Sequence, residues 1–118
     1  MAIKSKAKGK KNELAFVNLL KAAGYPSARR GQQFQGTEES PDVLCSELPI
    51  IHFEIKSGAR PNPWLALKQC ANDKGQNQLS VVGVHKDREP WIICMTAEDW
   101  FSLIKKADLS IPVDSHPK

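Results

Sequence analysis

The sequence predicts a mixed α/β fold in which helices flank a central mixed sheet. Three segments carry the apolar spacing and capping residues of helices, and short β-rich runs lie between them. Their order is helix, three strands, helix, two strands, helix, which is typical of a layered α/β domain. With 118 residues, 41% hydrophobic and 25% charged, the chain has the size and composition of one globular domain.

Capping residues and apolar stripes place the helices. An apolar stripe predicts a helix over 12–23. Asn62 followed by Pro63 predicts the start of a second helix, which Gly75 ends, and Thr96 is the expected N-cap of a third.

The folded part is expected to have loose ends. We expect a basic flexible arm over 1–11, a single domain over 12–106 and a C-terminal tail over 107–118. We also expect Trp64, Trp91 and Trp100 to pack in the core rather than to stack on bases.

The strands are marked by turn residues between β-rich runs. A short strand is expected around Ala28, followed by a polar, mobile loop. The segments "PDVLC" and "IIHFEIKSG" flank the turn "SELP" and predict a hairpin, and "QLSVVGV" and "PWIICM" predict two later strands. Cys45, Cys70 and Cys94 lie far apart among apolar residues, so we expect buried thiols and neither disulfides nor a zinc site.

The charge is concentrated at the N-terminus. The net charge is +4, and five of the 17 Lys and Arg residues precede Glu13, which leaves 12 against 13 Asp and Glu in the rest of the chain. Such an arm suits contact with nucleic-acid phosphates, and its alternative is a solvated tail. Because no apolar signal segment or run of about 20 apolar residues occurs, we expect a cytoplasmic protein.

The strand "IIHFEIKSG" raises a problem of charge. Side chains alternate between the faces of a strand, so Phe53 and Ile55 face the core while Glu54 and Lys56 point to the other face. If the hairpin turn is centred on Leu48, Asp42 lies opposite Glu54, with Cβ atoms about 5 Å apart. Two opposed carboxylates are destabilising unless a cation lies between them, and a slip of one residue would separate them.

These residues fit a metal-assisted phosphodiester hydrolase. Mg²⁺ binds one or two carboxylates and leaves room for water and phosphate, which Asp42 and Glu54 could provide. Lys56 could orient a water or neutralise charge on the phosphate. Glu13 could hold a second ion or a metal water, although an acid in a first helical turn is also favoured by the helix dipole. The alternative is that Glu54 and Lys56 form a weak surface ion pair.

Pro41-Asp42 and the strand "FEIK", with Glu54-x-Lys56, resemble the motif of the PD-(D/E)xK nuclease superfamily. The expected elements match its restriction-endonuclease-like αβββαβ core. The resemblance implies an Mg²⁺- or Mn²⁺-dependent endodeoxyribonuclease in which Asp42, Glu54 and Glu13 bind metal. It also implies catalytic roles for Glu13, Asp42, Glu54, Lys56 and Gln69. Gln69 matches a glutamine thought to orient Lys or water, and its alternative is an exposed helix residue.

The small size further resembles archaeal-type and phage-type Holliday junction resolvases, with Arg29, Arg30 and Gly31 in the region of their basic loop. That resemblance implies branched DNA as the substrate, a role in DNA recombination, a homodimer, and a bacterial, archaeal or phage-infected host cell. The alternative is a non-catalytic or partner-dependent DNA-binding protein that keeps the fold. The side chains expected to contact phosphates are Lys8, Lys10, Lys11, Arg29, Arg30, Arg60 and Lys74, with Lys68 and Lys86 as further candidates.

Overall fold

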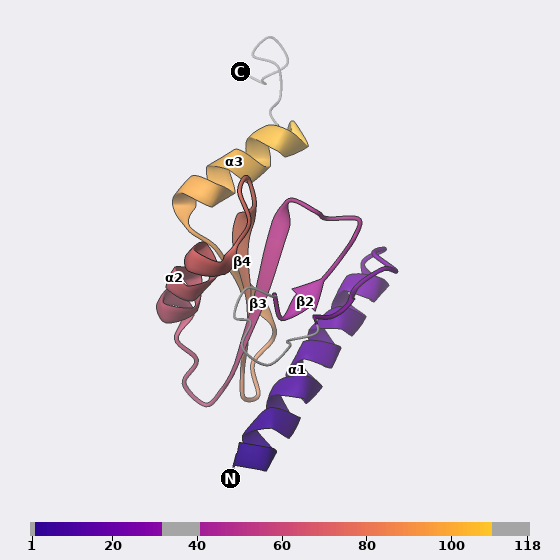
Figure 1. Cartoon of the computed structure of the whole chain (residues 1–118), viewed down its shortest axis with the longest axis vertical. Helices are drawn as coiled ribbons and strands as arrows, with labels where there is room; N and C mark the ends of the chain where they lie inside the picture. The colour runs from indigo at the N-terminus through magenta and orange to yellow at the C-terminus, as the bar shows by residue number, and fades with distance from the viewer. Residues whose placement is uncertain (1, 32–40, 110–118) are drawn as a thin grey trace, which may run out of the picture.

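The structure is a computed structural model that describes residues 2–31 and 41–109, with side chains from Gly9 onwards (Figure 1). It confirms the mixed α/β class and the predicted order of elements. The elements are α1 (Ala2–Ala22), β1 (Arg29–Arg30), β2 (Val43–Leu44), β3 (Ile51–Gly58), α2 (Pro63–Asp73), β4 (Leu79–Lys86), β5 (Ile92–Cys94) and α3 (Ala97–Ala107).

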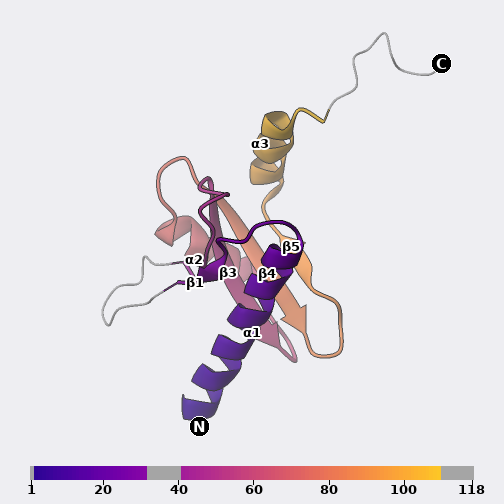
Figure 2. The ribbon, with the colours of Figure 1, turned by 90° about the vertical axis from the view of Figure 1, so that its right-hand side faces the viewer.

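The five strands form one mixed sheet in the order β1-β2-β3-β4-β5. Neighbouring strands are antiparallel except β3 and β4, which are parallel and are joined through α2. Helices α1 and α2 cover opposite faces of this sheet, while α3 stands beyond one end of it (Figure 1, Figure 2). The predicted hairpin of β2 and β3 is confirmed.

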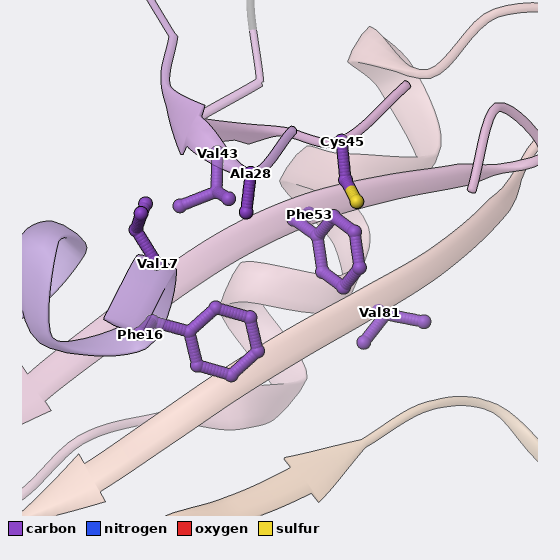
Figure 3. Close-up of a cluster of buried hydrophobic side chains, with 7 residues drawn as sticks. All are labelled: Phe16, Val17, Ala28, Val43, Cys45, Phe53 and Val81. Carbon is purple, nitrogen blue, oxygen red and sulfur yellow. The ribbon is translucent and has the colours of Figure 1, made fainter. Parts of the chain in front are cut away.

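The main core lies between α1 and the sheet, where seven buried side chains meet (Figure 3). The ring of Phe16 packs 5.7 Å from that of Phe53, measured between centroids. Gly83 of β4 makes this contact possible, since a Cβ atom there would lie 2.7 Å from Cε1 of Phe16. The glycine therefore lets α1 pack closely against the sheet and helps to set the distance between the helix and the strands.

A smaller core lies under α2, where Ala66 packs on Val82 and Val84. This helix starts as predicted, because the Asn62 side chain accepts a hydrogen bond from the Leu65 N–H at 3.2 Å and Pro63 follows it. The third helix also has its predicted cap, with Thr96 Oγ1 accepting from the Asp99 N–H at 3.1 Å.

The first helix differs from the prediction. We expected a flexible arm over 1–11 and a helix from residue 12, but α1 begins at Ala2 and includes the lysine-rich segment. Lysine and alanine have high helix propensities, so the segment extends the amphipathic helix despite a cost of about 1 kcal/mol at Gly9. The expected loop at 32–40 and the tail beyond residue 109 lie outside the described residues.

The prediction of buried thiols is confirmed for Cys45 and Cys70. The tryptophan prediction is wrong for Trp64 and Trp100, whereas Trp91 packs against the main core, with its ring centroid 5.4 Å from that of Phe16. Cys45 and Cys70 are buried, Cys94 is partly buried, and all three are free thiols. Trp64 is instead 74% exposed and Trp100 47% exposed, because the apolar stripes of α2 and α3 that carry them are not covered within the described chain. No helix in the described ranges combines the length and apolar character that crossing a membrane requires.

Candidate active site

The hairpin register places Asp42 across from Glu54, as predicted. Val43 pairs with Phe53, and the Asp42 N–H donates to the Phe53 carbonyl oxygen at 3.0 Å. Strand β2 begins at Val43, so Asp42 directly precedes it. There the Asp42 carboxylate, rather than a backbone carbonyl, accepts a hydrogen bond from the Ile55 N–H of β3 at 2.8 Å. The side chain of Asp42 is thereby held against the middle of β3.

Asp42 and Glu54 form a close pair of carboxyl groups. Glu54 is buried, with 7% of its surface exposed, and its side chain hydrogen-bonds to that of Asp42. Burial, followed by the hydrogen bond and charge of Glu54, raises the pKa of Asp42 to about 8, although the Ile55 N–H opposes the shift. Without a cation, burial and the neighbouring acid therefore favour the protonated form of the Asp42 carboxyl.

His52 is a functional candidate that our sequence analysis missed. Its ring is 2% exposed, and Nε2 lies 3.0 Å from Oε1 of Glu54. The Cys70 thiol of α2 donates to the His52 carbonyl oxygen at 3.5 Å, so α2 also contacts the backbone of β3 at this residue. The signal was available, because residues 52 and 54 share a strand face and a charged group there needs a buried partner.

Glu13 reaches the same region from α1 but has a cationic partner. Arg30 Nε donates to Glu13 Oε1 at 2.8 Å, with the two side chains 35% and 18% exposed. The charge of Glu13 also raises the pKa of Asp42, as the smallest of the contributions. In this state Arg30, which we expected to contact phosphate, instead neutralises Glu13.

Gly31 explains how Arg30 comes to lie beside Asp42. Its N–H donates to the Asp42 carbonyl oxygen at 2.9 Å, and a Cβ at this position would fall 1.9 Å from the Pro41 carbonyl oxygen. Any larger residue would push the two segments apart. Gly31 therefore lets the chain after β1 run close beside the Pro41-Asp42 segment and continue the antiparallel pairing of β1 with β2.

Lys56 and Gln69 have weaker structural support. Lys56 is partly buried on the same face of β3 as Glu54, and it has no ion pair with any residue in the described ranges. Gln69 is exposed on α2, and none of the hydrogen bonds recorded for the described chain joins its side chain to the carboxylates. The structure therefore places Lys56 beside the pair and gives no contact that recruits Gln69.

The other predicted phosphate contacts lie on the surface. Among them, the side chain of Lys8 lies outside what the structure describes, and Lys74 is partly buried at the end of α2. The exposed ones are Lys10, Lys11, Arg29, Arg60, Lys68 and Lys86.

The carboxylate pair suits a hard divalent cation. No group of three or more His, Cys, Asp or Glu side chains in the described chain is arranged to hold a metal ion. Mg²⁺ nevertheless needs only one or two carboxylates, because waters and substrate phosphate complete its octahedron. Asp42 and Glu54 meet that requirement, and a cation between them would replace the proton that they share.

Comparison of the chain with protein-family models, with curated proteins and with solved structures returned no match. The resemblance to nucleases therefore depends on the short motif and on the site geometry described above.

Proposed function

We propose that the protein is a metal-dependent DNA endonuclease built on a restriction-endonuclease-like core. The observation that carries this proposal is the pair formed by Asp42 and Glu54 on adjacent strands. The two acids are held in hydrogen-bonding contact. This makes ionisation of Asp42 less favourable and, together with burial, raises its pKa to about 8. A structural site gains nothing from opposing two acids, whereas a cation site requires it.

The proposal gives each group around the pair a chemical role. Asp42 and Glu54 would hold Mg²⁺ or Mn²⁺, which when bound would supply an activated water and stabilise negative charge on the phosphate. Lys56, two residues beyond Glu54 on the same face, would orient the water or neutralise the phosphate. His52 would act as a positioning residue, because its hydrogen bond fixes the carboxylate of Glu54.

Arg30 and the basic part of α1 are the proposed contacts to DNA. Arg30 is 35% exposed at its ion pair with Glu13, so its guanidinium can reach an incoming phosphate without a change in the sheet. Lys10 and Lys11 lie on the exposed surface of the same helix that carries Glu13. Branched DNA is the substrate that the resemblance to junction resolvases favours.

One observation favours a different function. The ion pair with Arg30 occupies Glu13, the acid that the resemblance assigns to the metal. A protein that binds DNA without cutting it could keep this pair as a permanent structural contact. The two functions differ in whether purified protein cleaves DNA when Mg²⁺ or Mn²⁺ is added.

The test is a cleavage panel on four-way junctions, flaps, single strands and plain duplex. We expect cleavage that requires metal, with symmetric paired cuts on the junction. Glu54→Gln and Lys56→Ala should abolish cleavage while DNA binding in Ca²⁺ stays near the wild-type level. Glu89→Gln is the matched control, because Glu89 is exposed in the turn before β5 and its substitution should leave cleavage unchanged. Full cleavage by the Glu54 variant would reject the assignment, and binding without any cleavage would favour the accessory function.

A further inference from the structure

Helix α3 has an apolar face that the described chain does not cover. None of its residues is buried, yet it carries Trp100, 47% exposed, and Phe101, 57% exposed. Its main polar anchor is Asp99, which accepts from the Ser80 N–H of β4 at 3.1 Å. Because α3 is fixed to the sheet through Asp99, the side of the helix opposite that residue, which includes Phe101, points away from the sheet.

An apolar groove continues this surface across the edge of the sheet. It has a volume of about 530 Å³ and lies between α2, β5 and α3. Trp64, 74% exposed, and Ile93, 55% exposed, form part of its wall, and Trp100 joins it to the face of α3. Strand β5 is the last strand of the sheet, so the groove runs along a free edge. We refer to the exposed side chains of Trp64, Leu65, Ile93, Trp100 and Phe101, together with the partly buried Ile104, as the α3 patch.

The α3 patch is large enough to form the apolar centre of a protein interface. The three aromatic side chains alone expose on the order of 300 Å² at the fractions given above, taking about 150–250 Å² for each whole ring. That area lies at the lower end of the range for the largest apolar patch on a monomer, about 300–600 Å², and such a patch is often functional. The aliphatic members extend it toward the roughly 800 Å² per partner of a standard interface.

The charges on α3 identify the partner as a second copy of this chain. Glu98 lies in the first turn and Lys105 in the last, seven residues apart and therefore on the same side of the helix. When two α3 helices pack antiparallel about a two-fold axis near Phe101 and Ser102, Glu98 of each copy meets Lys105 of the other. A parallel arrangement would place like charges together. This pattern is self-complementary, as an isologous interface requires.

We infer that the α3 patch is the interface of a two-fold homodimer in which the α3 helices run antiparallel. The proposal depends only on exposed apolar surface and on the charges of one helix. It does not rest on nuclease activity, and its failure can be told apart from the failure of the proposed function.

The first test is the mass of the full chain in solution. Light scattering after size exclusion should give about 26 kDa, twice the chain mass of 13.1 kDa. Phe101→Glu should give a monomer with an unchanged circular dichroism spectrum, because Phe101 supports no buried contact. Glu54→Gln serves as the matched control, since it should lose cleavage and remain a dimer. A wild-type monomer at high micromolar concentration, or a Phe101 variant that stays dimeric, would overturn the proposal.

The second test fixes the arrangement of the helices. Glu98→Lys and Lys105→Glu should each weaken the dimer at least tenfold, because each places like charges opposite one another twice. Mixing the two variants should restore a dimer, since every pair across the interface is then of opposite charge. The double variant should also dimerise. Single variants that bind as tightly as wild type, or a mixture that stays monomeric, would rule out the antiparallel two-fold arrangement.

Discussion

Replacing Asp42 with asparagine should stabilise the metal-free protein at alkaline pH while abolishing its proposed activity. In the folded chain the pKa of Asp42 is raised from 3.8 to about 8, first by burial and then by Glu54. Between these two values the folded state binds more protons than the unfolded state, so the free energy of unfolding falls as pH rises. The amide of the Asp42→Asn variant is neutral, can still accept from the Ile55 N–H and can donate to Glu54, so the variant avoids this loss.

The size of the effect follows from the shift. One pKa unit corresponds to about 1.4 kcal/mol, which sets an upper limit of about 6 kcal/mol for ionising Asp42 in the fold. The high effective dielectric of a partly hydrated site reduces this, and we expect a gain of about 2–3 kcal/mol for the variant above pH 8. In a domain of this size that gain raises the melting temperature by roughly 5–15 °C.

Urea unfolding in EDTA, followed by circular dichroism from about pH 5 to about pH 9, measures this difference. The two proteins should have similar stability at the acidic end, and the variant should become more stable as pH rises. Taking the difference between them removes the contribution of groups that titrate in both. Added Mg²⁺ should stabilise the wild type most at alkaline pH and the variant little. A variant that is less stable than wild type at alkaline pH, or a difference independent of pH, would refute the proton-sharing pair.

Three further outcomes are expected. His52→Ala should weaken Mg²⁺ binding, measured by calorimetry, by about 10–100-fold, and His52→Gln should recover part of the loss, whereas equal affinity in all three proteins would exclude a positioning role. Replacing Lys10 and Lys11 with Ala should reduce the slope of log affinity against log salt for DNA by about 2, and an unchanged slope would show that these lysines contact no phosphate. Gly83→Val should lower the free energy of unfolding in urea by about 1–3 kcal/mol, because its side chain meets the ring of Phe16, and wild-type stability would contradict the close approach of α1.

The register of the hairpin could be predicted because two local rules agree. The turn at "SELP" sets which residues face each other, and the alternation of Phe53 with Glu54 sets which side chains join the main core. The close contact between Gly31 and Pro41 could not be predicted, since the sequence does not reveal that the Pro41 carbonyl lies against Gly31. Trp100 was misplaced for a related reason: an apolar stripe shows that a helix face must be covered but not whether the same chain covers it.

The start of α1 was misjudged for a different reason. A run of lysines is compatible with a solvated arm and with a helix, because lysine is polar and also a good helix former. The outcome matters for the proposed function. A helix carries its lysines on a rigid axis that is fixed to the sheet by Phe16, so Lys10 and Lys11 are held at a set distance from Glu13.

In the metal-free state each of the three acids at the proposed site has a temporary partner. Burial and Glu54 favour the protonated form of Asp42, and Glu13 is neutralised by Arg30. Under the proposed function, metal binding would release the proton from the first pair, and an incoming phosphate would compete with Glu13 for Arg30. Binding of phosphate and binding of metal would favour each other. A phosphate that binds Arg30 would leave Glu13 without its cationic partner, and a metal ion bound by Asp42 and Glu54 would then be attracted by the charge of Glu13. Metal and DNA should therefore bind cooperatively, and replacing Arg30 with Ala should reduce the coupling between them more than it reduces binding of either one alone.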